Sequence, residues 1–211
     1  TWAEVSLDAI DHTFRMSQKQ LKPTTLVCCA IKADAYGHGA ETLAKEYEKL
    51  GADWFAVSNL EEAMQLRNVG ISLPILILGY TPPCFAAKLS ELNIAQAVLS
   101  AEYGEALSNE AAKAGVTVRV HIKLDTGMSR IGFLYQNPNR DAAVIDDIET
   151  VCKLPALNAE GIFTHFAVAD EGNDGHAYTL MQYDDLIKAV MLLEQRGITF
   201  KIKHCANSAA V

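Results

Sequence analysis

The chain has 211 residues, of which 50% are hydrophobic and 21% are charged, and its formal net charge is -8. The apolar fraction is enough for one substantial core, and the acidic balance argues against nucleic acid or an anionic membrane surface as a partner, because either needs clustered Lys and Arg. No apolar run approaches the roughly 20 residues that cross a bilayer, and the start TWAEVSLDAI lacks the order of a signal peptide. We therefore expect a cytoplasmic protein with a small-molecule ligand and no membrane contact.

Strands and helices are predicted to alternate along the whole chain. Short apolar, β-branched runs predict strands at 25–33, 54–58, 74–79, 95–100, 118–125, 160–166 and 200–207. Helical patterns between them, which end in glycine, lie at 39–51, 60–70, 101–115 and 178–197. Nearly all-apolar strands joined by helices are typical of a parallel sheet covered on both faces.

Two α/β architectures fit this order, an open doubly wound sheet and a (β/α)8 TIM-type barrel. The segment KADAYGHGAE after the first strand lacks the Gly-x-Gly-x-x-Gly fingerprint of a dinucleotide-binding sheet, which favours the barrel. The predicted strands are too few to close such a barrel, and the crossover after the last one has barely begun. We expect residues 1–211 to be a single incomplete barrel domain belonging to a longer enzyme.

The five cysteines are an odd number and contain no Cys-x-x-Cys pair. Reduced thiols in the core of a cytoplasmic protein are therefore predicted. The alternative for Cys205, which comes shortly before a polar Asn-Ser pair, is a thiol in a site.

Polar residues gather at the ends of the predicted strands. They are Lys32, Asn59, Lys123, Asp125, His165, His204, Asn207 and Ser208. In a barrel these ends share one mouth, where active sites lie. No spacing of metal ligands occurs, and the acidic pairs Glu61–Glu62 and Asp184–Asp185 are predicted to be solvated helix faces.

Lys32 stands at the end of the strand in CAIKADAYGHG, residues 29–39. Its amine either reaches solvent along a packed stem or, in a partly dehydrated pocket, acts as a nucleophile toward an aldehyde such as pyridoxal phosphate. Gly37 and Gly39 allow the backbone to pass close to such a ligand. Tyr36 is then either a phosphate donor or an aromatic lid over the loop.

Three further candidates have two interpretations each. Ser208 is either a plain helix cap or a phosphate donor at a helix N-terminus. Arg130 either bonds an anionic oxygen or pairs with Asp125. His165 is either a satisfied core group or lies against the face of an aromatic cofactor.

The blocks AIKADAYGHG, KLDTGMSRIGF, THFA and HCANSAA closely resemble, in order and spacing, the motifs of the alanine racemase family. These are pyridoxal 5'-phosphate (PLP) enzymes with a (β/α)8 barrel and a C-terminal β-domain. The resemblance implies an isomerase that interconverts L- and D-alanine for peptidoglycan precursors, as a homodimer in full length. The alternatives are a serine or broad-specificity racemase and a non-catalytic PLP-binding protein; other barrel PLP enzymes, such as decarboxylases, have different motifs.

The resemblance also assigns roles by position. By resemblance, Lys32 is the catalytic base and holds PLP, and Tyr36 and Ser208 bind its phosphate. Arg130 bonds its phenolic oxygen and contacts substrate, and His165 lies beside its ring. Asn207 is a cofactor-binding residue of the same network as the supporting His204, and Lys123 matches a position that is carbamylated in several members and steadies Arg130. The second base, a tyrosine from the partner's C-terminal domain, and the arginine at the pyridine nitrogen lie outside these residues, so we expect this segment alone to be inactive. Ser129 departs from the Gly or Asn of many members.

Overall fold

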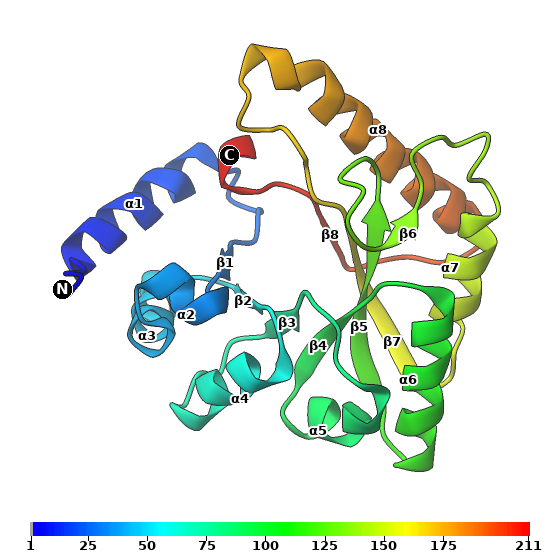
Figure 1. Cartoon of the computed structure of the whole chain (residues 1–211), viewed down its shortest axis with the longest axis horizontal. Coiled ribbons are helices and arrows are strands. Elements are labelled where there is room, and N and C mark those ends of the chain that lie inside the picture. Colours follow the sequence, from blue (N-terminus) through cyan, green and yellow to red (C-terminus); the bar gives the residue numbers. More distant parts are fainter. Residues whose placement is uncertain (1) are drawn as a thin grey trace. The chain divides into compact units, whose positions relative to one another are not determined.

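A computed structural model of the chain describes residues 2–211 (Figure 1). The chain divides into two units by its internal contacts. The first comprises the residues up to Thr81 together with Glu91–Gln96, and the second comprises Pro82–Ser90 and Ala97–Val211. Each unit is a run of parallel strands with helical connections, which agrees with the alternation predicted from the sequence.

The first unit is built on four parallel strands. Its elements are α1 (Leu7–Gln20), β1 (Cys28–Ala30), α2 (Lys32–Gly37), α3 (Ala40–Leu50), β2 (Trp54–Val57), α4 (Leu60–Asn68), β3 (Ile75–Ile77) and the start of β4 (Ile94–Val98). Strand β1 pairs with β2, β2 with β3, and β3 with β4, all in parallel. Strands β2, β3 and β4 are buried along their whole length, because their residues are almost all apolar.

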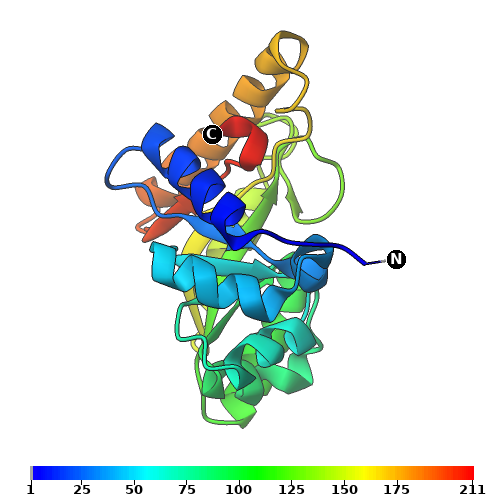
Figure 2. The ribbon, with the colours of Figure 1, turned by 90° about the vertical axis from the view of Figure 1, so that its left-hand side faces the viewer.

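Helices α1 and α3 pack against each other in this unit (Figure 2). The buried Phe14 of α1 meets the ring of Tyr47 on α3, with centroids 5.6 Å apart. Helix α3 ends at Gly51, whose φ of 92° lets its N–H reach back to the last carbonyls of the helix. The glycine stop predicted for this helix is confirmed.

The second unit is built around the long strand β5. Its elements are a 3-10 turn η1 (Pro83–Phe85), α5 (Ala86–Glu91), the end of β4, α6 (Ala101–Lys113), β5 (Val118–Asp125), β6 (Phe133–Leu134), α7 (Val144–Cys152), β7 (Leu157–Phe163), α8 (Asn173–Gln195), β8 (Ile202–His204) and a 3-10 turn η2 (Ser208–Ala210). Strand β5 pairs in parallel with β7, and β7 pairs with β8. The short strand β6 adds to the end of β5.

A bulge between Val120 and His121 interrupts the pairing of β5 with β7. It lies opposite Gly161, where a side chain would be 2.5 Å from Nδ1 of His121. Glycine is therefore needed here, because the His121 ring occupies the place of a Cβ atom.

The predicted strands are confirmed, with small shifts in their ends. Strand β7 begins at Leu157, before the predicted start at 160, and β1 stops at Ala30, before Lys32. The sequence did not predict β6, α5 or α7, which are short elements with weak patterns. The prediction of core cysteines is wrong: all five are free, but Cys28 and Cys84 are exposed and the others only half-buried.

Helix α8 is the longest helix, and Figure 1 shows it as the orange segment. Along residues 2–211, no helix combines the length and apolar character that a membrane crossing requires. The single-domain assignment for residues 1–211 stays a prediction.

Candidate active site

Lys32 lies two residues past the end of β1 and begins an unusual turn. Ala33, Asp34, Ala35 and Tyr36 all have φ between 51° and 56°, so α2 is a left-handed turn of residues that are not glycine. The Nζ atom of half-buried Lys32 lies 5.9 Å from the centroid of the Tyr36 ring, while the Tyr36 side chain is 61% exposed. The turn therefore presents an amine and a phenol together at the end of a parallel strand.

The turn is held by a side chain that the sequence analysis assigned to a solvated face. Glu62 on α4 accepts the N–H of Ala33 at 2.8 Å and the N–H of Ser58 at 2.7 Å. Its own N–H donates to Asn59, the N-cap of α4. The prediction of a solvated acidic pair is thus wrong for Glu62, although Glu61 is exposed.

The second acidic pair differs from its prediction in the same way. Asp184 is exposed, but Asp185 is 3% exposed and pairs with Lys188 at 3.1 Å. From the sequence, both aspartates belong to one polar stretch. Only the packing of α8 shows that Asp184 faces solvent and Asp185 is buried.

In the second unit, Asp125 at the end of β5 organises the turn that carries Arg130. Its carboxylate accepts the backbone N–H groups of Gly127, Ser129 and Arg130 at 2.9 to 3.0 Å. Burial alone would raise the pKa of Asp125, but the hydrogen bonds from these N–H groups outweigh burial and hold the pKa below its usual value. Asp125 therefore bonds the backbone of Arg130, and the alternative of an Asp125–Arg130 ion pair is not what the described residues show.

Arg130 itself is exposed. The residue before it, Ser129, has a φ of 55°, a left-handed conformation that Gly and Asn adopt more easily than Ser. The Ser129 hydroxyl accepts a hydrogen bond from Gln136 at 2.9 Å, which helps to hold the turn.

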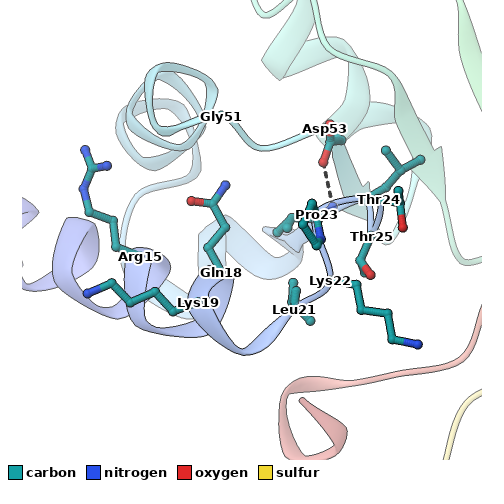
Figure 3. Close-up of a pocket in the computed structure, with 12 residues that line it drawn as sticks. Arg15, Gln18, Lys19, Leu21, Lys22, Pro23, Thr24, Thr25, Gly51 and Asp53 are labelled. Carbon is teal, nitrogen blue, oxygen red and sulfur yellow. Dashed lines mark hydrogen bonds between the residues drawn. The ribbon is translucent and has the colours of Figure 1, made fainter.

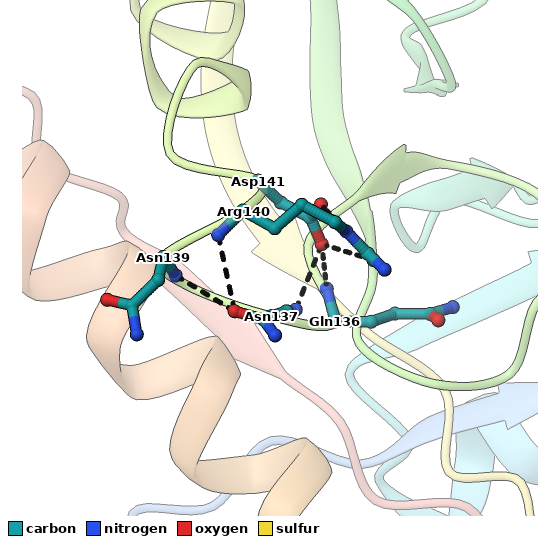
Figure 4. A network of polar contacts seen from close by, with 5 residues as sticks. All are labelled: Gln136, Asn137, Asn139, Arg140 and Asp141. Atoms are coloured by element: carbon teal, nitrogen blue, oxygen red, sulfur yellow. Dashed lines mark hydrogen bonds and ion pairs between the residues drawn. The ribbon is translucent and has the colours of Figure 1, made fainter.

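The polar loop 136–141 is held together by its own hydrogen bonds (Figure 4). Asp141 accepts the N–H groups of Gln136 and Asn137, both at 2.9 Å, and the side chain of Arg140 at 2.6 Å. Gln136 in turn donates from its side chain to Asp125 at 3.2 Å. The loop 136–141 is thereby linked to the carboxylate that positions Arg130.

Lys123 and His204 lie on either side of Phe163. The Nζ atom of Lys123 is 5.4 Å from the centroid of the Phe163 ring and donates to the carbonyl of Leu124, and the His204 ring stacks on Phe163 at 4.5 Å. Nδ1 of His121 is 3.0 Å from Nε2 of His204. These contacts join the two predicted supporting residues through one aromatic ring.

Burial sets the protonation of both groups. It lowers the pKa of Lys123 to about 8; the Arg130 charge adds to this lowering, and Asp125 opposes it. It also lowers the pKa of His204 to about 3, with His121 and Lys123 adding to the effect. At neutral pH the His204 ring is therefore uncharged. A minority of Lys123 amines are neutral at that pH, and this fraction grows as the pH approaches 8.

His165, Asn207 and Ser208 follow the last strands of this unit. His165 comes shortly after β7 and is half-buried, and its carbonyl accepts a hydrogen bond from Gln182 at 3.1 Å. Asn207 occupies the N-cap position of η2, so exposed Ser208 is the first residue of the turn rather than its cap. The Oδ1 atom of Asn207 is buried and, within residues 2–211, has no hydrogen-bond partner.

The predicted residues thus form two groups, each within one unit. Lys32, Tyr36 and Asn59 belong to the first unit, and the others belong to the second, where Lys123 and His204 share Phe163. Glu62, Gln136 and Gln182 were not assigned to the site from the sequence, whereas Asp125 was placed among the polar strand-end residues at the barrel mouth. Only the Asn-x-x-Glu spacing of Asn59 and Glu62, a helix-start pattern, offered a signal.

Two pockets lie away from most of these residues. One, of about 660 Å³, is lined by the end of α1 and the segment leading to β1, with Arg15, Lys19 and Lys22 at its edge (Figure 3). The other, of about 440 Å³, lies between the first half of α8 and residues 205–210. Neither contains Lys32 or Arg130.

Comparison with known proteins gives a consistent match. Residues 5–211 match the family model described as alanine racemase, N-terminal domain. The chain is 46% identical over 210 residues to an alanine racemase from Desulfovibrio desulfuricans, covering 100% of this chain and 54% of that protein. The chain therefore spans about half the length of the curated relatives it matches.

Solved structures agree. The alanine racemase of Clostridium difficile 630 in complex with cycloserine is 38% identical with a TM-score of 0.91, over 100% of this chain and 56% of that one. A histidine racemase from Leuconostoc mesenteroides is 29% identical with a TM-score of 0.84, over 97% of this chain and 52% of that one. The predicted fold class, an α/β barrel of the TIM type, is confirmed by these matches.

Proposed function

Because the chain belongs to the alanine racemase family through its N-terminal domain, we propose that the whole protein is a PLP-dependent racemase that interconverts L- and D-alanine. The observation that carries this proposal is the placement of Lys32 two residues past the end of a parallel strand, with its amine 5.9 Å from the centroid of the Tyr36 ring. The product would supply D-alanine for peptidoglycan. We also propose a cytoplasmic homodimer, as the resemblance implies.

The side chains of the described residues fit PLP. The cofactor needs an amine for its aldehyde, donors for its phosphate and a cation for its phenolic oxygen. The first unit offers Lys32 and the exposed phenol of Tyr36, and the second offers the exposed Arg130. The buried, unpartnered Oδ1 of Asn207 shows that this part of the second unit has a polar group available for a further partner.

The roles of the residues follow from their chemistry. PLP, when bound, supplies an electron sink for the Cα carbon of an amino acid. Lys32 removes and returns the Cα proton on one face, as a base held at a strand end. Arg130 donates charge-assisted hydrogen bonds to anionic oxygens of cofactor and substrate, and His165 packs beside the ring. The base on the other face is expected from the partner subunit.

We further infer that Lys123 takes up CO2 as a carbamate. The ammonium first loses one proton; the neutral amine then forms the N–C bond to the carbon of CO2, one C=O π pair moves to oxygen, and the nitrogen loses a second proton. The buried cation thus becomes an anion able to pair with Arg130, with two protons released in all. The lowered pKa of Lys123, about 8, supports this step, because only the neutral amine attacks CO2.

Alanine is the proposed substrate, and a broader specificity is the second candidate. The similarity to the Leuconostoc mesenteroides histidine racemase supports this second candidate, because that protein has a related fold and is named for a different amino acid. A racemisation assay of the full-length protein over L-alanine, L-serine and L-histidine separates the two. Equal turnover of all three would contradict an alanine racemase.

The first prediction tests Lys32. After incubation with PLP and borohydride, the adduct should lie on the peptide that contains Lys32, and Lys32→Ala should abolish it. The matched control is Lys45→Ala, an exposed lysine on α3, which should label normally. In the full-length enzyme, Lys32→Ala should lower kcat/KM by at least about a hundredfold. An adduct on another lysine, or unchanged activity, would contradict the proposal.

A further inference from the structure

The turn after Lys32 is held in an unfavourable conformation. Four successive residues that are not glycine, Ala33–Tyr36, adopt left-handed φ values between 51° and 56°. Each costs roughly 1 kcal/mol or more relative to the right-handed form. Such a conformation persists only where neighbouring groups fix it, and it tends to occur at functional sites.

The far end of the turn is fixed from within. The side chain of Asp34 accepts the N–H of Ala40 at 2.7 Å, and its carbonyl accepts the N–H of Gly39 at 3.0 Å. The N–H of Ala35 donates to the carbonyl of Ile31 at 2.9 Å. These contacts close the turn but do not connect residues 33–36 to a neighbouring strand, although the N–H of Ile31, before Lys32, donates to the carbonyl of Ala56 on β2 at 2.9 Å.

Glu62 makes that connection at the entrance of the turn. One oxygen accepts the N–H of Ala33, the residue after Lys32, and the other accepts the N–H of Ser58, directly after β2. Both bonds, at 2.8 and 2.7 Å, have the short length of charge-assisted hydrogen bonds. One carboxylate thus ties the turn to the end of the adjacent strand.

We propose that Glu62 is a positioning residue that fixes the left-handed turn and thereby aims the amine of Lys32 and the phenol of Tyr36. The expected effect on PLP labelling rests on the proposed function, in which the amine of Lys32 binds PLP. Without the carboxylate, the N–H of Ala33 loses its acceptor and the turn relaxes toward the right-handed form. Lys32 then leaves its place at the end of β1.

The test compares Glu62→Gln with Glu61→Gln, which changes the adjacent, exposed glutamate in the same way. Glutamine cannot accept both N–H groups, so hydrogen exchange at the Ala33 amide should accelerate about tenfold or more in Glu62→Gln. The rate of borohydride-trapped PLP labelling at Lys32 should fall by a similar factor. Glu61→Gln should match the original chain in both.

A thermal unfolding curve shows whether each variant folds. If Glu62→Gln does not, Glu62→Asp keeps the charge but is too short to bridge both N–H groups, and it should show the same two effects. Unchanged exchange at Ala33 and unchanged labelling at Lys32 in a folded Glu62 variant would overturn the proposal. If the original chain fails to label at Lys32, the proposed function fails, while exchange at Ala33 still tests the positioning role.

Discussion

At the scale of single residues, burial changes what Lys123 can do. Its side chain is 3% exposed, and that burial lowers its pKa from the ordinary 10.5 to about 8. The neutral fraction of the amine therefore rises as pH rises through about 8, whereas lysines of ordinary pKa stay protonated there. A reaction that needs the free amine is then selective for this position.

We predict that carbamate forms at Lys123 and that its amount rises with pH at constant dissolved CO2, most steeply below about 8, where the amine is still mainly protonated. The measurement is the carbonyl NMR signal of protein equilibrated with isotope-labelled bicarbonate. Lys123→Met should remove the signal, and Lys113→Met, at an exposed position on α6, should retain it. A signal that persists in Lys123→Met would show that another amine reacts.

At the scale of elements, α8 holds two of the turns that carry site residues. Gln182, which is fully buried, accepts the N–H of Ala167 at 2.9 Å and donates to the carbonyl of His165 at 3.1 Å. One turn earlier on the same face, the Tyr178 hydroxyl donates to the carbonyl of Gly127 at 2.8 Å. Helix α8 therefore fixes both the segment after β7 and the turn after β5.

Replacing these side chains should loosen both turns to different degrees. Gln182→Leu removes the hydrogen bonds to the part-buried N–H of Ala167 and carbonyl of His165, so it should lower the free energy of unfolding by about 2 kcal/mol. Tyr178→Phe should cost about 1 kcal/mol, because it removes one half-buried hydrogen bond. Chemical denaturation measures both, and Tyr183→Phe, at an exposed position on α8, is the control. If all three variants were equally stable, α8 would have no such role.

The elements also show what sequence can and cannot predict. The strands and the place of Lys32 at a strand end were predictable, because apolar runs and a charged residue after them are local signals. The left-handed turn was not, because Ala33, Asp34, Ala35 and Tyr36 each disfavour that conformation locally. Glu62 was misassigned for a related reason: its partner Ala33 is 29 positions away, and helix periodicity does not report such contacts.

At the scale of the whole molecule, acid should destabilise the fold in two stages. The first stage comes from His204, whose pKa falls from 6.5 in the unfolded chain to about 3 in the folded one. Between these values the unfolded chain binds one proton more than the folded chain. Stability therefore falls as pH is lowered below 6.5, with a slope approaching about 1.4 kcal/mol per pH unit from this residue.

The second stage comes from carboxylates whose folded pKa is below the ordinary value. Asp125 and Asp141 are held below 3.8, and Glu48, Glu149 and Glu160 below 4.5. Their ionised forms stabilise the fold above these ordinary values, and this contribution is lost as pH falls through them toward the lower folded values. As the pH is lowered, the first stage begins at pH 6.5 and the second at about 4.5, so between these two values only the first contributes.

Two variants separate the stages. His204→Asn should flatten the loss of stability between pH 6.5 and 4.5, because no ring remains to bind the extra proton on unfolding. Asp125→Asn should be less stable at neutral pH, since its three N–H donors lose their anion, and should show a shallower loss below pH 3.8. Denaturant unfolding at a series of pH values measures both effects. A His204→Asn curve parallel to that of the original chain would mean that His204 is protonated in the fold, and that burial does not keep it neutral.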